Sequence, residues 1–450
     1  MARGALPGFR DFYPHDLAER AYIMRTWRDV ARRYGFAEYD GPPLEPLELY
    51  TKKSGDEIVG QLYNFTDKGG REIALRPEMT PTVARMVGER ANALRKPVRW
   101  FSMPQLFRYE RQQKGRLREH YQLNVDIFGE AGVAADAELA ACAIDTMRAF
   151  GLTSDDVVVR FSDRRLLNAL LAARGVPEAS FGAVYAVLDK LDRQPREVSL
   201  GQLAGGGLGA GAADALLAFV EASVASGTVE MLRAAGLSDE GARLLTEVDR
   251  YVAAVSRLLG SNAVEWLRFD LSIVRGLAYY TGLVFEIFDA RGEFRAVCGG
   301  GRYDTLLRSL GGTDLPALGF GMGDVVLGAL LRARGLMPDG APAVDAWVAA
   351  VDGTAGGDVL EAAGALRRAG HSVEYALRPQ TLDKQQKAAQ AAGARRLVLV
   401  PAGFGQDRRV HVVRPRDRVL LPLDAARLVP LDEAMRLPAA EPAAGPVAAR

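Results

Sequence analysis

Two strand-like runs joined by a short polar stretch constrain the fold of this chain more than any other feature. Residues 98–110 and 118–130 are rich in aromatic and branched side chains, and residues 111–117 between them are polar and contain a glycine. This composition predicts a β-hairpin and therefore an antiparallel sheet. Gln122 and Asp126 lie an even number of positions apart in the second run, so both side chains would point to one face of the strand.

The turn of this hairpin concentrates positive charge. Guanidinium groups on a loop beside a strand can clamp a polyphosphate and neutralise charge that develops at phosphorus. The alternative interpretation is a solvated charged turn, because most isolated basic runs lie on solvated faces. The cationic side chains on or beside the turn are Arg108, Arg111, Lys114, Arg116 and Arg118.

Hydrophobic patterns divide the chain into a split β-rich domain and a smaller C-terminal domain. The first is expected over residues 1–335 with a helical insertion at 165–258. After a linker rich in Pro and Gly, alternating strand and helix patterns predict an α/β domain with a parallel core over 345–430. The glycine-rich stretch 204–213 is expected to be a loop, and residues 431–450 a disordered tail.

Composition predicts a folded protein that stays in the cytoplasm. Hydrophobic residues make up 48% of the chain and charged residues 25%, as in ordinary globular proteins. The chain contains no apolar run near the ~18 residues needed to span a bilayer, and its acidic, proline-containing start does not match a signal peptide. Cys142 and Cys298 lie far apart and near no histidine cluster, so we expect neither a disulfide nor a bound metal. The net charge of +1 excludes only a chain that is basic throughout.

Three charged residues stand out in segments that otherwise favour helix or strand. Arg76 and Glu78 are expected to share a strand face before a helix that begins near Thr80, where Glu78 could bind an ammonium group. The alternative for Glu78 is a charge favoured by the helix dipole. Arg275 interrupts an apolar and aromatic run, and a buried guanidinium requires a partner: either a ligand anion or a structural salt bridge, for instance with Glu286.

Glycines mark two further segments. Gly319, Gly321 and Gly323 alternate along a predicted strand, which can then lie flat beneath a planar group. Glycines 299–301 similarly let the backbone approach a ligand closely. Close backbone packing explains both groups equally well. Neither has the spacing of a dinucleotide-binding or phosphate-binding loop.

Taken together and in this order, these segments resemble the histidyl-tRNA synthetase family over residues 8–428. Residues 34–50 with 54–58 look like the dimer-forming first class II motif, 107–130 resemble the second motif, and 273–286 resemble the histidine signature. The resemblance implies an α+β class II catalytic domain, built on a mixed, mainly antiparallel sheet with helices and carrying the helical insertion. It further implies a C-terminal α/β anticodon-binding domain and a homodimer.

The resemblance implies that L-histidine is activated by ATP, with Mg²⁺ on the phosphates, and is then transferred to histidine tRNA. Arg108 and Arg275 would act as the catalytic pair, flanking the α-phosphate while the histidine carboxylate displaces pyrophosphate. The implied ATP-binding residues are Arg108, Arg116, Gly321 and Gly323. The implied histidine-binding residues are Glu78, Thr80, Gln122, Asp126, Arg275, Tyr279 and Tyr280. The implied tRNA-binding residues are Arg111 and Gln113.

The sequence departs from the family pattern at several positions. Val325 and Val326 stand where the third class II motif usually has a Glu-Arg pair, so the arginine that would sandwich adenine is missing. Asp126 replaces a glutamate found in many relatives, and Ala278 replaces a frequent aspartate. These changes bear on ATP affinity more than on the identity of the amino acid.

The missing arginine leaves a second interpretation open, a non-catalytic regulatory subunit of ATP phosphoribosyltransferase in histidine biosynthesis. Such paralogues typically lack the anticodon-binding domain and have lost second-motif arginines, whereas this chain keeps both. A tRNA-binding protein without activation chemistry is a third interpretation. We therefore expect a histidine–tRNA ligase whose C-terminal domain offers phosphate contacts. The candidate arginines there are Arg408, Arg409, Arg414, Arg416 and Arg418.

Overall fold

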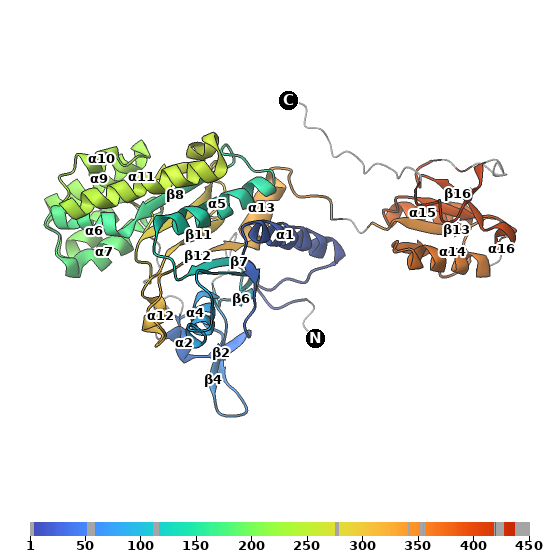
Figure 1. The fold of residues 1–450 in the computed structure, drawn as a ribbon, viewed down its shortest axis with the longest axis horizontal. Coiled ribbons are helices and arrows are strands. Elements are labelled where there is room, and N and C mark those ends of the chain that lie inside the picture. The colour runs from blue at the N-terminus through green and yellow to red at the C-terminus, as the bar shows by residue number, and fades with distance from the viewer. Residues whose placement is uncertain are drawn as a thin grey trace. The chain divides into compact units, whose positions relative to one another are not determined.

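A computed structural model describes most of the chain (Figure 1). The described residues are 4–51, 59–110, 117–274, 279–340, 343–351, 354, 356–417, 419 and 427–436. The chain divides into two compact units. The first comprises Met1–Asp11 and Glu19–Pro338, and the second comprises Phe12–Ala18 and Asp339–Arg450.

The first unit is built on a mixed, mainly antiparallel sheet, which confirms the expected fold class. Its strands are β1 (Ala37–Glu38), β5 (Val98–Ser102), β6 (Gln105–Phe107), β7 (Glu119–Phe128), β8 (Val157–Asp163), β9 (Leu267–Phe269), β10 (Leu283–Asp289), β11 (Cys298–Arg302) and β12 (Ala317–Gly323). Their order within the described residues is β1-β5-β7-β12-β11-β10-β8-β9, and β6 also pairs with β7. Only the pairs β1 with β5 and β8 with β9 are parallel there. The antiparallel pairing of β5 and β6 with β7 confirms the predicted hairpin.

One face of this sheet is covered by the main hydrophobic core. Helices α1 (Pro14–Arg33), α5 (Val133–Ala149) and α13 (Asp324–Ala333) supply much of that core. The odd-numbered β7 residues Leu123, Val125 and Ile127 are buried in it. Trp27 of α1 joins them, and its Nε1 donates a hydrogen bond to the sulfur of Met322 at 3.2 Å. The even-numbered side chains of β7 therefore point to the opposite face.

The insertion is helical, as expected, and Figure 1 shows its helices gathered at one end of the sheet. They are α6 (Arg164–Ala173), α7 (Phe181–Leu188), α8 (Arg196–Gly205), α9 (Ala210–Ser226), α10 (Glu230–Arg233) and α11 (Asp239–Leu259). Three 3₁₀ turns accompany them, namely Glu178–Ser180, Leu191–Arg193 and Ser261–Trp266. The prediction of a loop over 204–213 was wrong, because α8 and α9 leave only 206–209 between them. Buried residues of both helices give them packing energy that composition alone did not reveal.

A small antiparallel sheet precedes helix α4 (Thr80–Glu89) in the sequence, and α4 covers part of the second face of the large sheet. The strands of the small sheet are β2 (Leu44–Pro46), β3 (Asn64–Thr66) and β4 (Glu72–Leu75), and the nearby helices are α2 (Glu48–Thr51), α4 and α12 (Leu306–Ser309). The helix begins at Thr80, as predicted. Arg76 and Glu78 follow β4 rather than lying on it, which corrects the expected strand face. Both are buried all the same, because the turn carries them inward.

The second unit has the expected α/β pattern. Its elements are β13 (Ala346–Ala350), α14 (Gly356–Arg368), β14 (Val373–Tyr375), α15 (Leu382–Ala391), β15 (Leu397–Val400), α16 (Phe404–Asp407), β16 (Arg409–Val413) and β17 (Val429–Pro430). Strands β14, β13 and β15 form a parallel core, and β16 and β17 continue it antiparallel. Leu431 and Ala434 are buried in this unit, so 431–436 do not belong to the expected tail. No described helix combines the length and apolarity required to cross a membrane.

Candidate active site

A polar row on β7 lies beside a glycine row on β12. Antiparallel pairing places Gln122 opposite Gly323 and Asp126 opposite Gly319. Directly paired residues share a face of the sheet, so the polar side chains project beside a strip that lacks side chains. This arrangement confirms that Gln122 and Asp126 share one face. The two remaining members of the polar row are His120 and Asn124.

The glycines are required by the polar side chains that lean over them. A Cβ at Gly319 would lie 2.2 Å from Asp126 Oδ1, 2.6 Å from the Tyr303 hydroxyl and 2.8 Å from the Val125 carbonyl oxygen. A Cβ at Gly321 would lie 2.4 Å from the amide nitrogen of Gln122. These separations are shorter than real contacts, so the absence of side chains creates the space that the polar row occupies.

The carboxyl group of Asp126 is buried, and only one of its two oxygens accepts a hydrogen bond from a described residue. The Tyr303 hydroxyl donates a hydrogen bond to Oδ1. Among the described residues, Oδ2 is buried without a hydrogen-bond partner. Burial raises the pKa of Asp126 to about 7, although the bond from Tyr303 acts in the opposite direction. An N–H group of a ligand would satisfy Oδ2 and favour the charged form of the carboxyl.

Three tyrosines connect this carboxyl to Glu78. The ring centroids of Tyr279 and Tyr280 are 5.0 Å apart, and each ring meets Tyr303 edge-on at 5.8 and 6.3 Å respectively. The Tyr279 hydroxyl donates to Glu78 Oε2 at 3.1 Å. Segments some 200 positions apart in the sequence thus bring two buried carboxylates to one aromatic cluster.

Arg108 lies at the other end of the polar row. It follows β6, its backbone N–H donates to Arg118 O at 3.0 Å, and its Nε donates to Pro77 O at 2.9 Å. The second bond fixes the plane of the guanidinium next to the turn that carries Glu78. Burial and the charge of Arg108 lower the pKa of His120 to about 4, so this imidazole is neutral at pH 7. His120 Nε2 lies 3.3 Å from the side-chain oxygen of Gln122.

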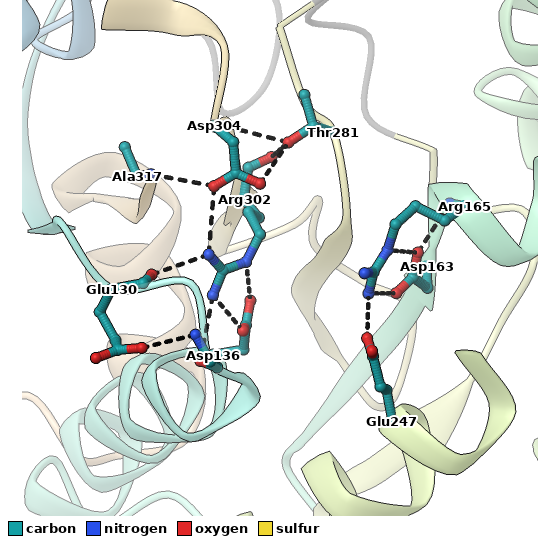
Figure 2. A network of polar contacts seen from close by, with 10 residues as sticks. Glu130, Asp136, Asp163, Arg165, Glu247, Thr281, Arg302, Asp304 and Ala317 are labelled. Carbon is teal, nitrogen blue, oxygen red and sulfur yellow. Dashed lines mark hydrogen bonds and ion pairs between the residues drawn. The ribbon is translucent and has the colours of Figure 1, made fainter. Parts of the chain in front are cut away.

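A buried network centred on Arg302 fixes the strand end that presents Tyr303 (Figure 2). Its guanidinium binds both oxygens of Asp136, at 3.1 and 2.5 Å, and Asp304 at 3.3 Å. Asp304 in turn accepts from the hydroxyl of Thr281, the residue after Tyr280, at 3.3 Å. Arg302 and Asp304 therefore connect the segment that carries Tyr303 to the segment that carries Tyr280. The bidentate geometry and buried partners compensate the desolvation of the charges.

The region of the expected third motif is organised differently from the family pattern. Val326 is half-buried and packs against the main core. Asp324, at the start of α13, accepts from the backbone N–H of Tyr121 at 2.9 Å and pairs with Arg10 at 2.8 Å. Arg10 also pairs with Glu119 at 2.6 Å. The helix start is therefore tied to the N-terminal segment by ion pairs.

The described candidates lie near one another, whereas others fall outside the described residues. Glu78, Tyr279, Tyr280 and Asp126 are joined through the tyrosine cluster. Gln122 shares a strand face with Asp126, Arg108 bonds to Pro77 beside Glu78, and Thr80, Gly321 and Gly323 lie on α4 and β12. The candidates outside the described residues are Arg111, Gln113, Arg116 and Arg275. Ala278 and the first-motif residues 54–58 also lie outside them.

Sequence reasoning missed His120 and Tyr303. His120 could have been found, because it continues the even spacing of Gln122 and Asp126 toward the basic turn. Tyr303 follows the glycine run 299–301, but its link to Asp126 depends on strand pairing across the sheet. Two residues of the same strip, Asn124 and Gly319, complete the polar row and its glycine floor.

Gly319→Ala should lower the unfolding free energy by about 1–3 kcal/mol, because the added methyl group would meet Asp126, Tyr303 and a backbone carbonyl at once. Thermal unfolding measures the change. Gly182→Ala is the matched control: Gly182 lies in α7 with open space around a Cβ, and alanine there should be neutral or slightly stabilising. Equal melting temperatures for Gly319→Ala and wild type would contradict the assigned crowding.

The first unit has the fold of a class II aminoacyl-tRNA synthetase catalytic domain. The mixed sheet carries a polar hairpin strand beside a glycine strand, with a helical insertion and a separate α/β unit. A solved histidyl-tRNA synthetase from Nostoc sp. PCC 7120 superposes with a TM-score of 0.78 at 22% identity, covering 97% of this chain and 99% of that chain. An ATP phosphoribosyltransferase regulatory subunit/histidyl-tRNA synthetase from Bacillus halodurans C gives 0.70 at 22% identity, covering 88% and 98%. At this identity the likenesses establish the fold.

Sequence comparisons identify the family. The family model described as histidyl-tRNA synthetase matches residues 8–323. A histidine–tRNA ligase of Opitutus terrae is 46% identical, over 92% of this chain and 93% of its own length. The chloroplastic/mitochondrial histidine–tRNA ligase of Arabidopsis thaliana is 40% identical, over 90% and 82%. The chain belongs to the histidyl-tRNA synthetase family.

Proposed function

We propose that this protein is a histidine–tRNA ligase. It activates L-histidine with ATP to histidyl-adenylate and pyrophosphate, then transfers histidine to the 3′ end of histidine tRNA. The observation that carries the proposal is the placement of Glu78 and Asp126 at the two ends of one tyrosine cluster, with Arg108 bonded to Pro77 beside Glu78, within a chain that is 46% identical to a histidine–tRNA ligase. Two carboxylates and one arginine match an amino acid with a cationic amine, an imidazole and a carboxylate.

Histidine recognition is assigned to the two carboxylate ends of the tyrosine cluster. Glu78, Thr80 and Gln122 hold the α-amino group. Asp126 and Tyr280 read the imidazole nitrogens, with Tyr279 fixing Glu78 by its hydrogen bond. Because Asp126 Oδ2 has no hydrogen-bond partner among the described residues, an amino acid without a polar ring would leave it unsatisfied. Such a penalty gives strong discrimination without editing.

Activation is assigned to arginines around the α-phosphate. Arg108 is assigned to the α-phosphate and the histidine carboxylate, and Arg275, outside the described residues, is assigned to the opposite side of the same phosphate. Arg116 is assigned to the terminal phosphates, and Gly321 and Gly323 to the nucleotide. A Cβ would meet Gln122 at Gly321 but only His120, at 4.0 Å, at Gly323, so the free space above β12 lies over Gly323. Mg²⁺ would enter with ATP, whose phosphate oxygens are ligands of the kind this ion prefers. The two guanidinium groups stabilise the charge that develops as carboxylate displaces pyrophosphate.

Binding of tRNA is assigned to the hairpin turn and the second unit. Arg111 and Gln113 approach the acceptor end, and the α/β unit serves as the anticodon-binding module. Its arginines differ in availability. Arg409 donates to a backbone carbonyl and Arg414 pairs with Asp417, whereas Arg416 is exposed. Arg416 is therefore the best-placed described candidate for a phosphate contact.

Histidine-dependent exchange of pyrophosphate into ATP, followed by aminoacylation of histidine tRNA, tests the function on the full-length protein. Both reactions are expected. Exchange without aminoacylation would restrict the chain to adenylate formation. Absence of exchange, with histidine binding retained, would favour the regulatory subunit suggested by the missing third-motif arginine. Binding of tRNA without any histidine-dependent exchange would leave only a tRNA-binding protein.

We propose that the enzyme is a homodimer. The small sheet presents an apolar face on which Phe65 is 49% exposed and Leu44 40% exposed. The pairing of Phe65 with Ile73, and of Leu44 with Leu75, places these side chains on the same face. The strand β2 belongs to the segment that resembles the dimer-forming first motif, so a second copy is the expected partner.

Phe65→Asp should shift the protein from dimer to monomer, because a desolvated carboxylate in an apolar interface is strongly unfavourable. Sedimentation velocity at micromolar concentration measures the shift. Leu377→Asp is the control, since Leu377 is 87% exposed in the second unit and its charge should leave the assembly unchanged. A Phe65→Asp protein that stays dimeric, or a monomeric wild type, would contradict the proposed interface.

A further inference from the structure

A buried arginine outside the assigned site contacts the loop that carries the histidine-reading tyrosines. Arg164, the first residue of α6, is 9% exposed. Its Nη1 donates a hydrogen bond to the backbone carbonyl of Tyr280 at 2.8 Å, and its own backbone N–H donates to Gly282 O at 3.1 Å. Arg164, where the helical insertion begins, thus donates hydrogen bonds to two backbone carbonyls of the segment 280–282.

The other side of the same guanidinium meets the insertion. Its central carbon lies 4.5 Å from the ring centroid of Tyr185 in α7. The Tyr185 hydroxyl donates to Asn168 of α6, which holds the ring in place. A planar, delocalised cation can stack on an aromatic face and donate in its own plane at the same time, and a lysine ammonium cannot do both.

The start of α6 is itself anchored, so the direction of Arg164 is fixed. The next residue, Arg165, binds both oxygens of Asp163 and also Glu247 of α11 (Figure 2). Asp163 additionally caps the helix by accepting from the Arg165 backbone N–H at 2.8 Å. Because the start of α6 is fixed, the hydrogen bond from Arg164 fixes the position of the Tyr280 carbonyl relative to this helix.

The position of that peptide determines where the tyrosine side chains lie. Tyr280 is buried against Tyr303, whose hydroxyl binds Asp126, and Tyr279 beside it binds Glu78. A shift of the Tyr280 backbone would move the side chains of Tyr279 and Tyr280 relative to Glu78 and Asp126. Small displacements of groups that hold a substrate cost affinity steeply.

We propose that Arg164 is a positioning residue that couples the helical insertion to histidine recognition. The inference rests on the proposed function, because it assigns Tyr279 and Tyr280 to the histidine pocket. Arg164 does not contact the substrate. It holds the Tyr280 carbonyl on one side and stacks on Tyr185 on the other, so histidine affinity depends on this contact at the start of α6.

Arg164→Met tests this coupling, because methionine keeps apolar contact with Tyr185 and cannot donate to the carbonyl. The Michaelis constant for histidine in pyrophosphate exchange should rise about tenfold or more, as expected for loss of a buried charge-assisted hydrogen bond. The Michaelis constant for ATP should change less than about twofold. The dissociation constant of histidine, measured by equilibrium dialysis without ATP, should rise in parallel.

Arg174→Met is the matched control. Arg174, at the other end of α6, also stacks on an aromatic ring, with its central carbon 4.1 Å from the centroid of Phe219, so its loss removes a similar stack away from Tyr185 and the Tyr280 loop. Its histidine affinity should equal that of wild type. Equal losses in both variants, or wild-type histidine affinity in a folded Arg164→Met protein, would overturn the coupling.

Arg164→Lys decides the question if the methionine variant does not fold. Lysine keeps the charge and one donor but loses the planar stack on Tyr185, so a selective rise in the histidine constants is expected and unchanged constants would overturn the proposal. Pyrophosphate exchange by the wild-type protein separates a failure of the ligase function from a failure of the role of Arg164. If wild type binds histidine but catalyses no exchange, the ligase assignment fails, and the dialysis measurements still decide the role of Arg164.

Discussion

Replacing Arg108 with alanine is expected to slow histidine-dependent pyrophosphate exchange about 100- to 1,000-fold, the usual loss when a preorganised donor to a developing negative charge is removed. Arg108 is half-buried, and the bond from Nε to Pro77 O fixes its guanidinium before any substrate arrives. A group that is already oriented stabilises the pentavalent phosphorus without reorganisation. The rate of adenylate formation in a single turnover measures the effect directly.

The matched control for this prediction is Arg99→Ala. Arg99 lies on the neighbouring strand β5, where its guanidinium pairs with Glu138 of α5 at 3.1 Å. It is a partly buried arginine of the same sheet without an assigned role in the reaction, so its loss should leave the exchange rate within about twofold. An Arg108→Ala enzyme that forms adenylate at the wild-type rate would remove Arg108 from the transition state.

The features predicted correctly from the sequence depend on local periodicity. The even spacing of Gln122 and Asp126 placed them on one face, because a strand alternates its side chains whatever surrounds it. The start of α4 at Thr80 followed from local residue preferences in the same way. Glu78 was assigned to a strand because its apolar neighbours resemble one, but the chain turns inward after Leu75. Burial at a turn leaves no periodic signal.

The features that sequence reasoning missed depend on contacts between distant segments. Tyr303 reaches Asp126 only because β7, β12 and β11 are neighbours in the sheet. The same holds for Arg10 and Asp324, which form an ion pair although they are 314 positions apart in the sequence. Neither partner is unusual in its local sequence, and a single sequence contains no information on which strands become neighbours. The resemblance to a family supplied the order of segments, whereas strand pairing supplied these contacts.

The Arg10 to Asp324 pair also bears on the missing third-motif arginine. In this chain the start of α13 is held by an ion pair to the N-terminal segment, and Val326 packs into the core. The helix is therefore stable without a charged residue at position 326. The packing of Val326 against the core and the ion pair of Asp324 explain how valine is tolerated at that position.

Asp126→Asn is expected to stabilise the protein while strongly weakening its affinity for histidine. Burial raises the pKa of Asp126 from 3.8 to about 7, so the folded protein retains a proton that the unfolded chain loses. Stability from this group is present below pH 4 and falls as the pH rises from 4 to 7; above pH 7 the charged carboxylate costs about 4 kcal/mol. Asparagine is neutral, has nearly the same shape and still offers Tyr303 an acceptor.

Thermal unfolding of Asp126→Asn should therefore show a melting temperature several degrees above wild type at pH 8, with a gain that shrinks as the pH is lowered toward 4. The dissociation constant of histidine should rise about 100-fold or more, because the amide cannot supply the charged acceptor at Oδ2. Tyr303→Phe is the control: it removes a hydrogen bond that lowers the Asp126 pKa, so the midpoint of histidine binding should move to higher pH. A pH-independent gain in stability would show that folding does not raise the pKa of Asp126. Wild-type histidine affinity in Asp126→Asn would remove Asp126 from the imidazole site.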